Sequence, residues 1–189
     1  GNAVSLAGTV GSGGGLTKTG AGTLTITGAT TIGGDLNIST GTLVTPATIT
    51  LKGDFTNTSG TPLDAGSSNI IFDGTADQSI TEFNTTGTTT MSKTSGIVTL
   101  TGDISGGILT INGVGGTLNL GAGLTHAFTG AMNLTNGSID GNTSNISTTN
   151  FSSSNSNTRT VSLGTGTWTL TGTGTVWDMA TSTGATVTG

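Results

Sequence analysis

The chain has 189 residues, enough for one domain with a continuous core. Its net charge is −5, and only 7% of its residues are charged, so the sequence lacks the basic face that nucleic-acid binding requires. The absence of cysteine excludes disulfides and thiolate metal sites, and no apolar run is long enough to span a membrane.

Glycine supplies 35 residues, against roughly 13 for average usage. A Gly-x-y period is missing, which excludes collagen. The low hydrophobic content of 31% raises the alternative of disorder, but the apolar residues alternate with polar ones in short runs, as in half-buried strands. Because the chain begins at Gly1, we interpret residues 1–189 as a single domain that is a fragment of a larger repetitive protein.

In chain order, the clearest alternating runs predict strands near residues 24–26, 36–38, 49–51 and 118–120. No segment has apolar residues at helical spacing, so we expect no helix. Residues 142–157 are rich in Ser, Asn and Thr, with only Ile146 and Phe151 as apolar anchors, and predict a protruding loop or a loose turn.

A repeated Gly-x-apolar pattern begins at Gly34, Gly53, Gly102 and Gly130, at intervals that fit turns of roughly 19 to 28 residues. One such turn cannot bury its few apolar side chains alone, whereas stacked turns bury them as a continuous column. The sequence therefore predicts an all-β fold, a parallel β-helix (β-solenoid) of roughly eight irregular coils. The alternative is a β-sandwich. The aligned repeats predict that one interior column contains Leu36, Phe55, Ile104 and Met132.

The segment GGLTKTGAGTLTITG at residues 14–28 resembles the passenger-associated repeat of bacterial autotransporters, and TGTLV at residues 40–44 resembles the closing strand of that repeat. The resemblance covers about a sixth of the chain and implies a right-handed parallel β-helix on a bacterial surface. The remainder is similar, more loosely, to giant repetitive surface proteins of environmental bacteria and to virion fibres. No membrane barrel sequence accompanies the repeat.

Residues with catalytic or ligand-binding chemistry are few. Asp73 and Asp77 flank one expected turn and are the candidate carboxylate pair of a glycan-cleaving enzyme, which we disfavour because few basic residues are present to tune them. Asp35, Asp54 and Asp103 each follow a repeated glycine and are better interpreted as corner residues. The only histidine, His126, cannot build a zinc site without other ligands. We therefore expect no catalytic, metal-binding or cofactor-binding residues, no cofactor and no enzymatic activity.

Two tryptophans, Trp168 and Trp177, are candidates either for filling a wide end of the core or for stacking on surface glycans. The threonines at alternate positions from Thr165 to Thr175 suggest a different function, ice binding, in which their side chains would share one face of a single strand. As the leading function, we expect a structural, self-associating module of an extracellular or cell-surface filament, sheath or fibre. Its expected partners are other copies of itself, and the alternatives are a glycan- or surface-binding adhesin and an ice-binding protein.

Overall fold

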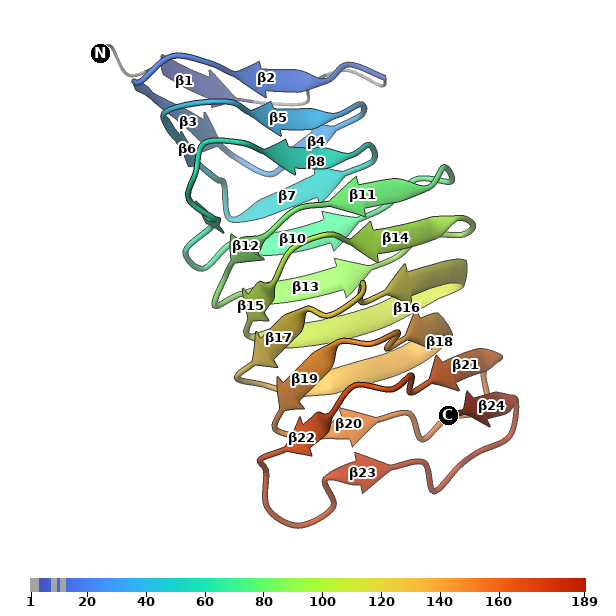
Figure 1. Ribbon diagram of the computed structural model, residues 1–189. Helices are drawn as coiled ribbons and strands as arrows, with labels where there is room; N and C mark the ends of the chain where they lie inside the picture. Colours follow the sequence, from blue (N-terminus) through green and yellow to red (C-terminus); the bar gives the residue numbers. More distant parts are fainter. Residues whose placement is uncertain (1–3, 8–9, 11–12) are drawn as a thin grey trace.

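The computed structural model describes residues 4–7, 10 and 13–189, which form an all-β rod of about eight stacked turns (Figure 1). The strand pairs in this part of the chain are parallel, and no helix occurs among these residues. No helix there is long and apolar enough to cross a membrane. The predicted parallel β-solenoid is confirmed, and the β-sandwich alternative is wrong because the strands lack its two facing antiparallel sheets.

Each turn of the rod contributes to three faces. Face 1 contains β4 (Thr30–Ile32), β7 (Thr48–Leu51), β10 (Asn69–Phe72), β13 (Thr88–Met91), the first part of β16 (Ile108–Asn119), the first part of β18 (Met132–Asp140), β20 (Phe151–Ser152) and β23 (Trp177–Asp178).

Face 2 follows each face 1 strand around a corner. It contains β2 (Leu16–Lys18), β5 (Leu36–Ile38), β8 (Phe55–Asn57), β11 (Gln78–Ile80), β14 (Ile97–Leu100), the second parts of β16 and β18, β21 (Arg159–Ser162) and β24 (Ala185–Thr188). Because β16 and β18 run around this corner without interruption, they join faces 1 and 2 into one sheet.

Face 3 closes each turn and is divided into two sheets. One contains β1 (Val4–Ala7), β3 (Thr23–Thr27) and β6 (Thr42–Val44). The other contains β9 (Leu63–Asp64), β12 (Phe83–Asn84), β15 (Ile104–Gly106), β17 (Thr125–Phe128), β19 (Asn145–Thr148) and β22 (Trp168–Leu170).

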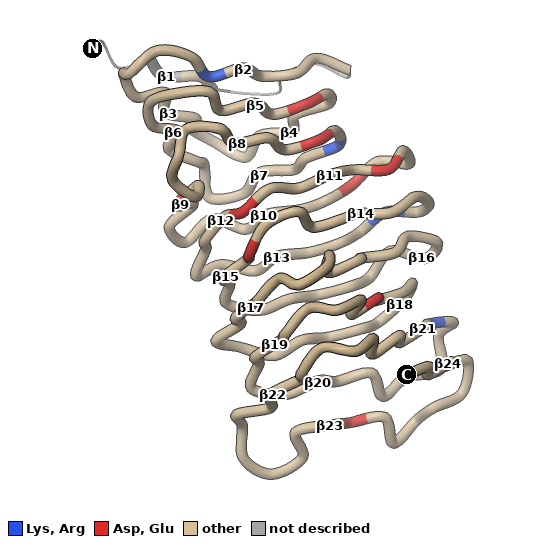
Figure 2. The backbone as a smooth tube through the Cα atoms, viewed as in Figure 1, with Lys and Arg blue, Asp and Glu red and all other residues tan. Residues whose placement is uncertain are grey.

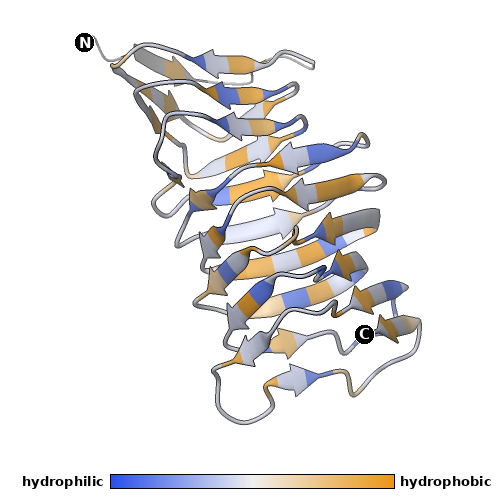
Figure 3. Cartoon of the chain, in the orientation of Figure 1, coloured by the Kyte–Doolittle hydropathy of each residue, from blue (hydrophilic) through white to orange (hydrophobic). Residues whose placement is uncertain are grey.

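Paired residues on neighbouring turns are 19 to 26 positions apart in the sequence, as for Leu36 with Phe55 and Phe151 with Trp177. Within each strand, alternate residues point inward. In β7, Ile49 is 1% exposed and Leu51 is 4% exposed, whereas Thr48 and Thr50 lie on the surface side. Figure 3 shows the same alternation of apolar and polar residues along the strands. Burying each such side chain contributes about 1.5–3 kcal/mol, so the stack is stabilised by its continuous core.

The repeated glycines do not all occupy equivalent places, which corrects one prediction from the sequence. Leu36 and Phe55 are neighbours in one column of face 2, but Ile104 lies on face 3 and Met132 on face 1, although all four are buried. The prediction of a single column is therefore wrong. The Gly-x-apolar pattern occurs where a strand begins after a corner, whichever face that strand belongs to. Glycine, which has no Cβ, fits the crowded corner, and the apolar residue that follows faces the core.

Of the two alternatives predicted for residues 142–157, the protruding loop is wrong, because the segment forms part of a turn of the stack, with residues 153–157 outside any strand. The segment contains β19 and β20, whose residues Ile146 and Phe151 are buried. Buried Ser144, Thr148 and Ser153 donate hydrogen bonds to backbone carbonyls, which is why a polar segment can line the interior.

Candidate functional site

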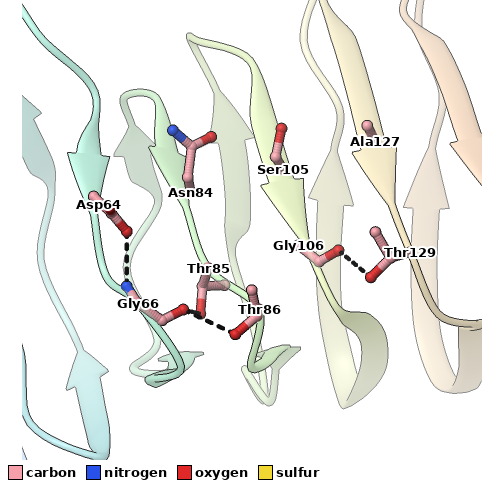
Figure 4. A pocket seen from close by; sticks show the side chains of 9 residues that line it. All are labelled: Asp64, Gly66, Asn84, Thr85, Thr86, Ser105, Gly106, Ala127 and Thr129. Atoms are coloured by element: carbon pink, nitrogen blue, oxygen red, sulfur yellow. Dashed lines mark hydrogen bonds between the residues drawn. The ribbon is translucent and has the colours of Figure 1, made fainter.

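A shallow groove of about 480 Å³ lies on the outer side of face 3, across β9, β12, β15 and β17 (Figure 4). Nine residues line it: Asp64, Gly66, Asn84, Thr85, Thr86, Ser105, Gly106, Ala127 and Thr129. The groove forms where outward-facing residues are small. Asn84 pairs with Ser105 on the next turn, and Ser105 pairs with Ala127.

The floor of the groove depends on Gly106. A Cβ atom at this position would lie 3.0 Å from the Phe128 ring, so the glycine lets that ring pack beneath the strand. Several polar groups of the wall are already bonded within the protein. Asp64 Oδ1 accepts the Gly66 N–H at 2.9 Å, and Thr86 Oγ1 donates to the Gly66 carbonyl at 3.2 Å (Figure 4).

The side chains of Asn84 and Ser105 are exposed in the groove and make no hydrogen bond to a described residue. With the Asp64 carboxylate, they offer hydrogen-bond donors and acceptors to a ligand lying along the rod. The lining contains one carboxylate and no histidine, lysine or arginine, so it offers no positive charge to an anionic ligand.

The acidic residues of the corners bond to the backbone of the next turn. Asp35 Oδ1 accepts the Asp54 N–H at 2.9 Å, Asp54 Oδ1 accepts the Ser79 N–H at 2.8 Å, and Asp103 Oδ1 accepts the Thr125 N–H at 2.8 Å. Their interpretation as corner residues is confirmed. Figure 2 shows several acidic residues along the edge where β5, β8 and β11 begin.

Asp73 and Asp77 flank the turn between β10 and β11, as the sequence suggested, and both have partners. Asp73 forms an ion pair with Lys52 at 3.1 Å, and Asp77 Oδ1 accepts the Ile97 N–H at 2.8 Å. Burial raises the pKa of Asp73, but a hydrogen bond from the Gly74 backbone and the nearby Lys52 more than offset this, so its pKa lies below the usual value. Within the described part of the chain, no group of three or more His, Asp or Glu residues is arranged to hold a metal ion.

Three of the four basic side chains are buried inside the rod, which the sequence did not reveal. Lys18 is 6% exposed, Lys93 is 0% exposed and Arg159 is 1% exposed. Their nitrogens donate to backbone carbonyls at the corners. Lys93 Nζ, for example, lies 2.6 Å from the Ala76 carbonyl and 2.8 Å from Gln78 Oε1. Each of these cations joins two neighbouring turns and is therefore not available to an external ligand.

Trp168 and Trp177 lie together at the C-terminal end of the core, on the inward sides of β22 and β23. Trp177 stacks on Phe151 with ring centroids 4.5 Å apart, and Trp168 meets the same ring edge-on at 5.8 Å. Both are only partly buried, because no further turn covers them in the described chain. They lie outside the face 3 groove, and their contact with glycans stays a prediction.

The threonines from Thr165 to Thr175 do not share one strand, so the prediction that they line one face of a single strand is wrong. Only Thr169 lies within β22, and the others fall in the flanking segments. A more regular row lies on the outer side of face 1, where Thr50, Ile71, Thr90 and Thr110 are in register on successive turns. Ile71 interrupts the hydroxyl pattern.

The chain was compared with protein-family models, with curated proteins and with solved structures, and it matches none of them.

Proposed function

We propose that this chain is a structural, self-associating module of an extracellular or cell-surface filament, sheath or fibre, in which solenoid units stack end to end. The proposal is carried by the stacking of the described turns, in which each turn covers the inward side chains of its neighbour and the last described turn presents the same kind of surface to a further solenoid turn. Three interior columns end there in Trp168, Trp177 and Val187, and Val187 is 50% exposed although its partner Val161 is 0% exposed.

The strand edges of the same turn support this proposal. β22, β23 and β24 each pair with a strand on one side only, so alternate backbone N–H and C=O groups face away from the rod. Another unit stacked on this end would pair those groups and cover the aromatic side chains. An end-to-end contact of this kind does not close on itself and therefore builds a filament.

The sparse charge of the chain is compatible with close contact between copies. Only 7% of residues are charged, and the net charge is −5 over 189 residues. Electrostatic repulsion between neighbouring units is correspondingly weak. The resemblance of residues 14–28 and 40–44 to autotransporter repeats supports a location outside the cell. These two segments contain β3 and β6, which pair on successive turns.

The test compares two lysine substitutions in β24. Val187→Lys places a charge in the open core of the last turn, whereas Thr186→Lys places it on the outer flank of the same strand. We expect the wild-type protein and Thr186→Lys to form end-to-end oligomers in analytical ultracentrifugation and electron microscopy, and Val187→Lys to remain monomeric. A wild-type protein that stays monomeric at high concentration would contradict the proposal.

The groove on face 3 favours a second candidate function, adhesion to a polar polymer such as a glycan. Its exposed Asn84 and Ser105 side chains offer hydrogen bonds along the rod. Ala127→Arg would fill the groove, and Thr90→Arg on face 1 is the matched control. Loss of binding on a glycan array by Ala127→Arg alone supports adhesion, and the absence of any glycan bound by the wild-type protein argues against it.

A further inference from the structure

The only histidine of the chain is enclosed within the rod and uses both ring nitrogens. His126 in β17 is 0% exposed, its Nδ1 accepts the Ile104 N–H at 3.1 Å, and its Nε2 lies 2.7 Å from the Leu120 carbonyl oxygen. A carbonyl only accepts and a backbone N–H only donates, so these partners select the neutral imidazole with its proton on Nε2.

This imidazole is the centre of a polar cluster that spans three turns. Ile104 belongs to the turn before it, and Ser144 belongs to the turn after it. Ser144 is 0% exposed, and its Oγ donates to the same Leu120 carbonyl that His126 contacts, at 2.9 Å. The contacts of one ring therefore link successive turns inside the corner between faces 2 and 3.

Side chains replace the ordinary backbone ladder at this point. The backbone pairing of β15 with β17 begins at Ser105 and Ala127. At the start of these strands, the Ile104 N–H bonds to His126 and the Thr125 N–H bonds to the Asp103 carboxylate. Protonation of Nδ1 would turn an acceptor into a donor facing the Ile104 N–H. The bond would be lost, and a charge would be buried beside an unsatisfied amide.

The surroundings do little to stabilise the charged ring. Burial lowers the pKa of His126, and the Leu120 carbonyl and the Asp103 carboxylate oppose this only in part. The neighbouring strands β15 and β19 have no titratable side chain. Glu82 precedes β12 beside Gly102, and Asp140 at the end of β18 is bonded to Asn119 and Asn142.

We propose that His126 is an acid-released latch. Protonation of its imidazole breaks the link between β15 and β17 and opens the corner between faces 2 and 3 locally, while the backbone ladder of the other turns remains closed. The unfolded chain takes up a proton near pH 6.5, above the pKa of the folded state. Stability is therefore complete above that pH and falls as the pH decreases from 6.5 toward the folded pKa.

The test is amide hydrogen exchange of the wild-type protein between about pH 7.5 and pH 5, corrected for intrinsic rates. We expect the Ile104 amide to lose protection by about tenfold per pH unit below pH 6.5, down to the pKa of the folded state. The Ile80 amide, in β11 on an earlier turn, is the internal control and keeps its protection. Equal losses at Ile104 and Ile80, or none at Ile104, would overturn the latch.

The variant His126→Gln distinguishes protonation of the imidazole from other effects of low pH on the protein. His126→Gln has no titrating ring, so its Ile104 protection is expected to be independent of pH, and a variant that keeps the wild-type dependence overturns the proposal. If His126→Gln does not fold, the imidazole of the wild-type protein is titrated by NMR. Its midpoint must mark the pH at which the loss of Ile104 protection levels off, and a plateau at a different pH refutes the latch.

Discussion

Buried polar side chains of the rod have hydrogen-bond partners, with one exception among the described residues. Thr89 lies 1% exposed on the inward side of β13, and its Oγ1 has no hydrogen-bond partner. Its neighbours in the same column are Ile70 and Leu109, so a hydroxyl group occupies an apolar site. An unsatisfied buried hydroxyl costs about 1–3 kcal/mol of folding free energy.

Replacing this hydroxyl with a methyl group is expected to stabilise the protein. Thr89→Val preserves the shape of the side chain and should raise the free energy of unfolding by about 1–2 kcal/mol. Thr148→Val is the matched control, because Thr148 is equally buried but donates to the Gly130 carbonyl at 2.8 Å, and it should destabilise. Urea denaturation of both variants measures the difference, and the same sign for both would contradict this account.

At this scale the sequence is a poor guide to the interior. Nothing in the sequence marks Lys93 and Arg159 as interior residues, whereas both are fully buried. Charged residues are ordinarily placed on the surface because desolvation is costly. The corners of a solenoid offset that cost, since several backbone carbonyls converge on one point. Arg159, for example, donates to the carbonyls of Ser153, Asn157 and Thr183. Such convergence is a property of the stacked turns and leaves no local signal.

At the scale of the strand, a recurring Asp or Asn bond begins the pairing of a turn with the next one. The bonds of Asp54 to the Ser79 N–H and of Asn145 to the Thr167 N–H, at 2.8 and 2.9 Å, occur on faces 2 and 3 respectively. Each satisfies a backbone donor at the start of a strand. A carboxylate or an amide oxygen serves equally well, which explains why both residue types occupy these corners.

This bond predicts different effects for two substitutions at one position. Asp54→Ala removes the acceptor of the Ser79 N–H and should lower the free energy of unfolding by about 0.5–1.5 kcal/mol. Asp54→Asn keeps an oxygen at the same place and should retain most of the stability. The melting temperatures of the two variants give the comparison, and an alanine variant as stable as the asparagine variant would refute the role of the bond.

The elements themselves were largely predictable. The runs near residues 24–26, 36–38 and 49–51 lie in β3, β5 and β7, because alternation of apolar and polar residues is enforced by the pleat. Residues 142–157 were not predictable, because their inward positions are occupied by hydroxyl side chains that resemble loop residues in sequence. The groove was also hidden, because it depends on which small residues become neighbours on different turns.

For the whole molecule, the stacked architecture followed from the need to bury sparse apolar pairs, but the register between turns did not. Turn lengths vary from 19 to 26 residues, so similar sequence patterns fall on different faces. About eight turns spaced by about 4.8 Å give a rod of roughly 40 Å. The two ends of the stack lie at opposite ends of one axis, so copies that meet end to end extend the rod along that axis.

The proposed assembly predicts growth in one dimension. In small-angle X-ray scattering at increasing concentration, the maximum dimension should rise in steps of roughly 40 Å while the cross-section stays constant. Val187→Lys should suppress the steps. A cross-section that widens with concentration would indicate side-by-side association and would contradict end-to-end stacking.

The long interval between paired residues has a mechanical consequence. A pull along the rod loads the hydrogen bonds of successive turns in series, so turns detach one at a time from a loaded end. Each turn occupies about 4.8 Å of the rod but contains 19 to 26 residues, which extend to roughly 60 to 90 Å when pulled straight. A tether built in this way absorbs work by lengthening many-fold before it ruptures, and it can rewind when the tension falls.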